Sequence, residues 1–148
     1  MDQRQAAMSY TGRCACGKVT LAIAGEPLAT RQCWCRQCQY VSGGGPVHNA
    51  MFHTADVRIE GELGTRQYTA DSGNTITQWF CAACAVPVYA QASVRPQFRT
   101  VRFGVLDQPH GLRPRMAIWT EAAPEWAVID PGLEQYARQP PPPVTPAR

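Results

Sequence analysis

The stretch Cys33-Trp34-Cys35-Arg36-Gln37-Cys38 places three cysteines within six residues. A single loop can aim three thiols spaced this closely at one point, as a thiolate-bound metal ion requires. Two further pairs flank this stretch, Cys14-Ala15-Cys16 and Cys81-Ala82-Ala83-Cys84. Short cysteine pairs commonly supply two ligands each to a zinc ion. The sequence therefore predicts that its cysteines bind metal.

The number and setting of the cysteines favour metal binding over disulfides. Seven cysteines cannot all pair within one chain, because seven is odd. The N-terminal MDQRQAAMSY is polar where an export signal needs an apolar core, and no stretch reaches the roughly 18 apolar residues that span a bilayer. We therefore expect a cytoplasmic protein with reduced, zinc-binding thiols and no membrane partner.

Composition and charge indicate a globular domain that does not bind nucleic acid. Hydrophobic residues make up 45% of the 148 residues and charged residues 17%, values outside the disordered range. The formal charge of +3 falls to zero if all seven cysteines are thiolates and hold two Zn²⁺ ions. The 14 Lys and Arg residues form no basic run, so nucleic acid is not an expected partner. The sequence leaves the oligomeric state open.

Hydrophobic patterning predicts a mainly β domain of short antiparallel strands. Runs rich in β-branched or aromatic residues predict strands at 18–24, 57–60, 66–70, 75–80, 86–91, 100–105 and 116–119. A short helix is expected around 35–40, and the Gly-rich segment 42–46 is expected to be a loop. The expected organisation is a flexible arm over 1–11, a zinc-binding domain over 12–136 and a Pro-rich tail over 137–148.

Seven thiols divide naturally into four and three. A site with four cysteines is closed and structural, whereas three cysteines leave one position open for water or a substrate atom. Spacing also permits a site made by the first four cysteines, with the last three left for the other. The closeness of Cys33, Cys35 and Cys38 favours a trio carried by one loop, with the two outer pairs joining distant parts of the chain.

These motifs resemble the family of glutathione-dependent formaldehyde-activating enzyme and centromere protein V. The resemblance is carried by the following segments: Gly12-Arg13-Cys14-Ala15-Cys16-Gly17, Gly25-Glu26-Pro27, the triple cluster with the Gly-rich loop after it, and Phe80-Cys81-x-x-Cys84. Weaker matches continue through Leu106-Asp107, Pro124-Glu125-Trp126 and Asp130-Pro131-Gly132-Leu133. The resemblance as a whole covers roughly residues 12–136.

The resemblance implies a β-tent architecture with two zinc ions, one structural and one catalytic. An open site of three cysteines is expected to hold its zinc less firmly than the closed site of four. In the family pattern the structural ligands correspond to Cys14, Cys16, Cys81 and Cys84, and the catalytic zinc is held by Cys33, Cys35 and Cys38. The implied activity is that of a carbon–sulfur lyase, which joins glutathione to formaldehyde as S-hydroxymethylglutathione. The implied partners are thus a small-molecule thiol and an aldehyde.

The sequence departs from the family pattern at two positions. Trp34 stands where a histidine commonly separates the first two cysteines of the triple cluster, and we expect it to pack in the core rather than line a pocket. Ala85 follows Cys84 where the family usually has glycine, which predicts an altered turn.

Histidines and arginines near the cysteines offer further candidates. We expect His48 and His53 to be hydrogen-bonded loop or surface residues, and the alternative is that they donate protons or supply a fourth metal ligand. Arg13, Arg31 and Arg36 are expected to offset thiolate charge, with binding of glutathione carboxylates as the alternative. The rival function is a nonenzymatic zinc scaffold that binds a macromolecule, and a third is redox sensing through Cys35 and Cys38.

Overall fold

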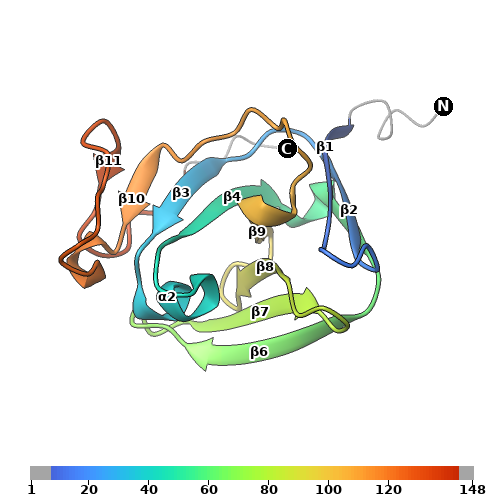
Figure 1. The fold of residues 1–148 in the computed structure, drawn as a ribbon, viewed down its shortest axis with the longest axis horizontal. Coiled ribbons are helices and arrows are strands. Elements are labelled where there is room, and N and C mark those ends of the chain that lie inside the picture. Colours follow the sequence, from blue (N-terminus) through green and yellow to red (C-terminus); the bar gives the residue numbers. More distant parts are fainter. Residues whose placement is uncertain (1–7, 144–148) are drawn as a thin grey trace.

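The computed structural model describes residues 8–143, which form two β-sheets (Figure 1). The smaller sheet has the strand order β1-β2-β5, and the larger has the order β11-β10-β3-β4-β9-β8-β7-β6. The strands are β1 (Met8–Arg13), β2 (Thr20–Ala24), β3 (Ala29–Cys33), β4 (Val47–His53), β5 (Val57–Glu60), β6 (Leu63–Thr69), β7 (Thr75–Cys81), β8 (Pro87–Ala92), β9 (Phe98–Arg102), β10 (Met116–Ile118) and β11 (Glu134–Gln135). The mainly β class predicted from the sequence is confirmed.

The larger sheet bends on itself. In Figure 1 it curves from β3 and β4 through β9 and β8 to β7 and β6, and the helix α2 (Arg36–Ser42) lies in the bend. The pairs are antiparallel except at β10, which runs parallel to both β3 and β11. The expectation of purely antiparallel pairing is thus wrong at β10, because long segments precede β10 and separate it from β11, and these can return the chain in the same direction.

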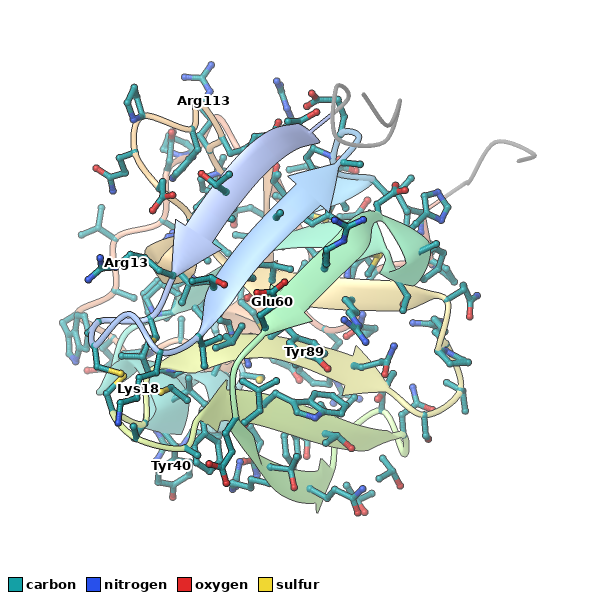
Figure 2. The ribbon with its side chains drawn as sticks, turned by 90° about the vertical axis from the view of Figure 1, so that its right-hand side faces the viewer. Arg13, Lys18, Tyr40, Glu60, Tyr89 and Arg113 are labelled. Atoms are coloured by element: carbon teal, nitrogen blue, oxygen red, sulfur yellow. The ribbon has the colours of Figure 1, made fainter. Side chains whose placement is uncertain are left out.

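The two faces of the larger sheet have different surroundings because side chains alternate along each strand. Ala50 and Phe52 of β4 and Val101 of β9 are fully buried on one face. They pack with residues of the smaller sheet into the main apolar core. Figure 2 shows the smaller sheet in front of the larger one. The opposite face of β3, β4 and β9 carries polar and charged side chains, and it borders the site described below.

The helical segments are short. α2 begins after Cys35, whose sulfur accepts a hydrogen bond from the amide of Cys38, and it ends at Gly43 with a left-handed φ of 86°. This confirms the helix expected around 35–40. The 3-10 turns are η1 (Thr54–Asp56), η2 (Phe103–Val105) and η3 (Thr120–Ala122). Within residues 8–143, none of the helices has both the length and the apolar character needed to cross a membrane.

The structure changes several expected boundaries. Residues 8–11, assigned from sequence to a flexible arm, belong to β1, which pairs with β2 along its length. The strand expected over 100–105 ends at Arg102 and continues as η2, and the expected strand 116–119 ends at Ile118. At the expected tail, the amide of Trp119 donates to the carbonyl of Arg138, and Pro140 is buried. The first seven residues of the arm and the last five of the tail lie outside the described residues.

Candidate metal centres and the adjoining cavity

Four cysteines from two turns meet beside the main core. Cys14 and Cys16 lie in the β1–β2 connection, and Cys81 and Cys84 lie where β7 turns into β8. All four sulfurs lie within 4.8 Å of one another, with 3.5 Å between Cys14 and Cys16 and 3.7 Å between Cys16 and Cys81. Zn–S bonds of about 2.3 Å in a tetrahedron place sulfurs roughly 3.8 Å apart. The quartet therefore has the dimensions of a closed zinc site.

Backbone amides point at the quartet's sulfurs. The amide of Val19 donates to Sγ of Cys14 at 3.3 Å, and the amides of Ala83 and Cys84 both donate to Sγ of Cys81 at 3.4 Å. Hydrogen bonds from amides favour the thiolate, which is the form that binds a metal. For Cys14, burial raises the thiol pKa, but the Val19 amide and the neighbouring sulfurs outweigh burial and bring the pKa down to about 6. This donor set suits a metal ligand.

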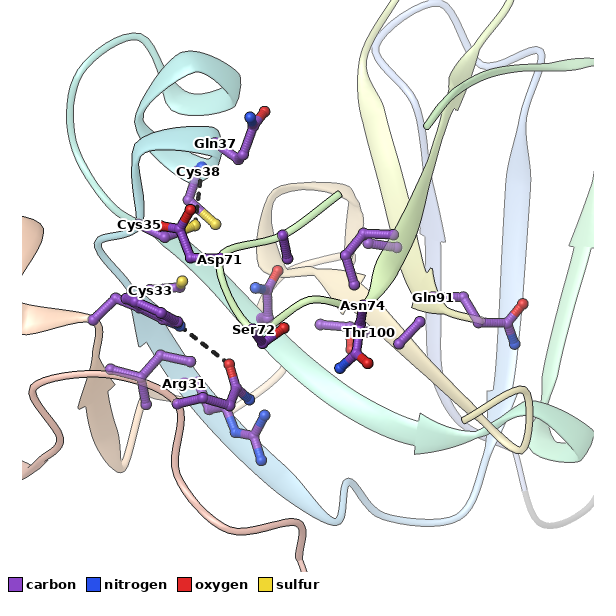
Figure 3. Close-up of a pocket in the computed structure, with 18 of the residues that line it drawn as sticks. Arg31, Cys33, Cys35, Gln37, Cys38, Asp71, Ser72, Asn74, Gln91 and Thr100 are labelled. Carbon is purple, nitrogen blue, oxygen red and sulfur yellow. Dashed lines mark hydrogen bonds between the residues drawn. The ribbon is translucent and has the colours of Figure 1, made fainter. Parts of the chain in front are cut away.

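The remaining three cysteines form a second cluster at the start of α2. Cys33 ends β3, Cys35 caps the helix, and Cys38 lies in its first turn. Figure 3 shows their three side chains gathered at one point, and the sulfurs lie within 4.8 Å of one another. Cys33 and Cys38 are buried, whereas Cys35 is half-buried. The trio favoured by the sequence is thus brought together.

The three sulfurs of the trio share negative charge unevenly. The hydrogen bond with Cys33 lowers the pKa of Cys35 to about 3. A bond with Cys33 also lowers the pKa of Cys38, but Cys35 and burial outweigh it and raise that pKa to about 12. Three adjacent thiolates repel one another unless a cation lies between them. The trio therefore fits a divalent metal ion, which would allow all three cysteines to ionise.

The trio differs from the quartet in having no fourth ligand. Across the described chain, no His, Asp, Glu or further Cys joins it. Its three cysteines instead line a cavity of about 200 Å³. A metal held there would keep one position for a ligand that enters from the cavity.

The cavity wall is rich in cations. Its lining includes Arg31, Arg36, Arg95 and Arg102, and Asp71 is the one carboxylate among the residues that form it. Asp71 lies on the β6–β7 turn, which Figure 3 shows close to the cysteines in projection.

The guanidinium of Arg66 joins α2 to the far edge of the sheet, because it donates to Gln37 at 2.7 Å and to Gln78 at 3.0 Å.

Neither His48 nor His53 is close enough to the trio to be its fourth ligand. His48 follows Val47, the partner of Cys33, so its side chain lies on the opposite face of the sheet. Its ring Nε2 lies 3.1 Å from the side-chain Nε2 of Gln32, and its ring stacks on Phe103. His53 packs against the ring of Phe98.

Trp34 packs as expected from the sequence. It is 3% exposed, and its indole N–H donates to the side-chain oxygen of Gln32 at 3.0 Å. Its ring meets Trp126 edge-on. It is absent from the cavity lining, so the alternative role as a pocket wall is not supported.

The three arginines singled out from the sequence occupy different places. Arg13, labelled in Figure 2, donates to the carbonyls of Cys14 and Ala15 and so braces the quartet's first turn. Arg36 donates to Gln39 and lines the cavity together with Arg31. Sequence reasoning missed Asn49, Tyr68, Arg95 and Arg102, which also line it. Only the prediction of a strand near residue 100 hinted at the position of Arg102.

A closed thiol quartet and an open thiol trio on a bent β-sheet define a class of thiolate-rich β proteins that can hold metal ions. The sequence model described as glutathione-dependent formaldehyde-activating enzyme matches residues 9–122. The chain therefore belongs to the glutathione-dependent formaldehyde-activating enzyme family. The resemblance seen in the cysteine motifs is confirmed.

A solved structure shares this fold. The crystal structure of a Rhodobacter sphaeroides protein, a structural genomics target, is similar with a TM-score of 0.55 and 22% sequence identity. The similarity covers 85% of this chain and 98% of the other. At this identity it supports the fold alone. Comparison with curated proteins gives no match.

Proposed function

We propose that the protein is a zinc-dependent enzyme that adds a thiol such as glutathione to a small aldehyde such as formaldehyde, a carbon–sulfur lyase reaction. Cys14, Cys16, Cys81 and Cys84 would hold a structural zinc, and Cys33, Cys35 and Cys38 a catalytic one. The observation that carries the proposal is the trio's position on the cavity wall. Its thiols must stay reduced, which suits the cytoplasm.

The proposed reaction needs a thiolate and a held carbonyl. A zinc ion on the trio would stabilise the substrate's thiolate at neutral pH. The cavity wall would orient the thiol so that its sulfur attacks the carbonyl carbon. A sulfur–carbon bond forms, the π electrons of the carbonyl move to its oxygen, and the proton lost by the thiol ends on that oxygen. No oxidant or reductant is required.

Tyr68 is suited to return this proton. It lines the cavity with the trio, and the guanidinium of Arg66 lies 5.0 Å from its ring centre. Burial, together with the negative charge of Cys38 and Cys35, raises the pKa of Tyr68, so the phenol stays protonated at neutral pH. A hydroxyl donor beside the trio can protonate the oxygen that develops charge, and its phenolate then takes up the proton lost by the thiol.

The size of the cavity favours this function over the rival scaffold role. A cavity of about 200 Å³ suits a small molecule, whereas a macromolecule needs an extended surface. Cys33, Cys35 and Cys38 are among the residues that line this cavity, which supports a site for a small molecule. The proposed partners are therefore a small thiol and an aldehyde.

The experiment follows the exchange of ¹³C-formaldehyde between its hydrate and its glutathione adduct by NMR exchange spectroscopy. The zinc-loaded protein should accelerate the exchange above the uncatalysed rate, and Cys35→Ser should return it to that rate. Arg58→Gln, on the exposed side of β5, serves as the matched control and should retain the acceleration. An exchange rate unaffected by the wild-type protein would contradict the proposal.

A further inference from the structure

We propose that Arg31, Asn49 and Arg102 form a carboxylate-binding subsite in the cavity, so that the thiol substrate carries a carboxylate near its sulfur. This inference builds on the proposed thiol site and names the class of thiol that it takes. It rests on the register of three strands, on the burial of the side chains and on the charge balance of the cavity.

The three residues lie in one row across the larger sheet. Arg31 of β3 pairs with Asn49 of β4, and Asn49 pairs with Arg102 of β9. Directly paired residues project from the same face, so the three side chains lie on one face of the sheet with Asn49 between the two arginines. Cys33 lies two residues after Arg31 and therefore projects from this face too. All four residues line the cavity.

The two arginines are buried without an acidic partner. Arg31 is 9% exposed and Arg102 7%, and Nε of each has no hydrogen-bond partner. Arg102 donates from Nη1 to Oδ1 of Asn49 at 2.9 Å. This bond leaves the NH₂ group of Asn49 as a donor. The ion pair found among residues 8–143 joins Arg138 to Glu121, away from this row. Buried cations without a counterion are costly, so the row is suited to an anion.

Thiolate charge alone does not balance these cations. Three thiolates on a divalent metal ion carry one net negative charge, whereas Arg31 and Arg102 together carry two positive charges. Arg36 and Arg95 add two more on the cavity wall, against the single carboxylate of Asp71. The cavity therefore keeps a positive surplus after a metal has bound. A planar carboxylate matches the fork of guanidinium donors better than a spherical anion does.

Strand geometry sets the reach of the ligand. The backbones of Cys33 and Arg31 are roughly 6.6 Å apart along β3, at about 3.3 Å per residue. A thiol bound at the trio needs a short spacer between its sulfur and a carboxylate at the row. A small mercapto acid has this form, whereas a neutral thiol leaves the row without a partner.

The test measures binding to the zinc-loaded full chain by calorimetry with three probes: 3-mercaptopropionate, its neutral methyl ester, and propionate, which has no thiol. The wild type should bind the mercapto acid at least tenfold more tightly than the ester. Arg31→Gln and Arg102→Gln should each remove most of this preference and leave ester binding unchanged. Arg58→Gln, on β5, should keep the preference.

Zinc content and thermal melting verify that each variant is folded. If Arg102→Gln does not fold, it is replaced by Arg102→Lys, which keeps the charge. Equal affinity of the wild type for acid and ester would overturn the subsite, as would a preference that survives both Gln substitutions. If neither thiol binds but propionate binds to the wild type and not to the Gln variants, the subsite stands and the proposed thiol site fails. If propionate does not bind either, both fail.

Discussion

Gly17 and Ala85 occupy corresponding positions in the two turns of the quartet, and both adopt the left-handed backbone conformation. Gly17 follows Cys16 with a φ of 81°, and Ala85 follows Cys84 with a φ of 67°. Each turn is closed by an amide-to-carbonyl bond, from Gly17 to Cys14 at 3.2 Å and from Ala85 to Cys81 at 2.8 Å. The second turn thus holds an alanine in the left-handed conformation, which glycine adopts without strain.

Replacing Ala85 by glycine should stabilise the protein. The left-handed conformation costs a residue with a Cβ roughly 1–2 kcal/mol, and replacement by glycine removes this cost. Glycine's greater freedom in the unfolded chain offsets about 0.5–1 kcal/mol of the gain. We expect Ala85→Gly to raise the free energy of unfolding of the zinc-loaded protein by about 0.5–1 kcal/mol in urea titrations. Gly17→Ala, the reverse change at the matching position, should lower it by about 1 kcal/mol. A loss of stability in Ala85→Gly would show that the alanine is not strained.

The quartet and the trio should differ in their importance for folding. Cys14 and Cys81 are each 1% exposed and belong to the main core, where a zinc ion would join the β1–β2 turn to the β7–β8 turn. Because structural zinc contributes folding free energy, Cys84→Ser should abolish cooperative thermal unfolding. Cys35→Ser should retain a cooperative transition, because Cys35 is half-buried and outside that core. Melting of Cys84→Ser at the wild-type temperature, followed by circular dichroism, would refute the structural role.

His48 should make stability depend on pH in mildly acidic solution. Burial lowers its pKa below 6.5, and its neighbours Gln32 and Phe103 carry no charge. The unfolded chain therefore binds a proton at a higher pH than the folded protein does. The contribution of His48 is complete above about pH 6.5 and is lost as the pH falls through the folded-state pKa.

The variant His48→Gln isolates this contribution. Its free energy of unfolding should fall less than that of the wild type between pH 6.5 and about pH 5, and the two curves should run parallel above pH 6.5. Acid release of zinc affects both proteins and cancels in their difference. Curves that stay parallel down to about pH 5 would mean that His48 is not titrating as a buried group.

Much of the fold could be predicted from the sequence because cysteine spacing and strand alternation are local signals. The runs at 18–24, 57–60, 75–80 and 86–91 correspond to β2, β5, β7 and β8. The trio could be predicted because its three thiols lie within one short segment. The quartet is joined across distant segments, so spacing alone left its membership open until the structure brought the outer pairs together.

Two of the strands that line the cavity, β3 and β4, could not be predicted from the sequence, for a physical reason. β3 reads Ala-Thr-Arg-Gln-Cys and β4 reads Val-His-Asn-Ala-Met-Phe-His, without a clear apolar alternation. One face of these strands meets the apolar core, while the other carries Arg31 and Asn49 into the cavity. Buried polar residues erase the pattern on which strand prediction depends. Arg31 and Asn49 therefore lie on strands that the alternation of apolar residues does not predict.

The most direct test is the zinc content of the purified protein and of Cys35→Ser, determined by elemental analysis against protein concentration. The division into a closed quartet and an open trio predicts two zinc ions per wild-type chain after loading, and one per chain in a folded Cys35→Ser variant. A wild-type protein that folds cooperatively without zinc, or a Cys35→Ser variant that still holds two ions, would contradict this division.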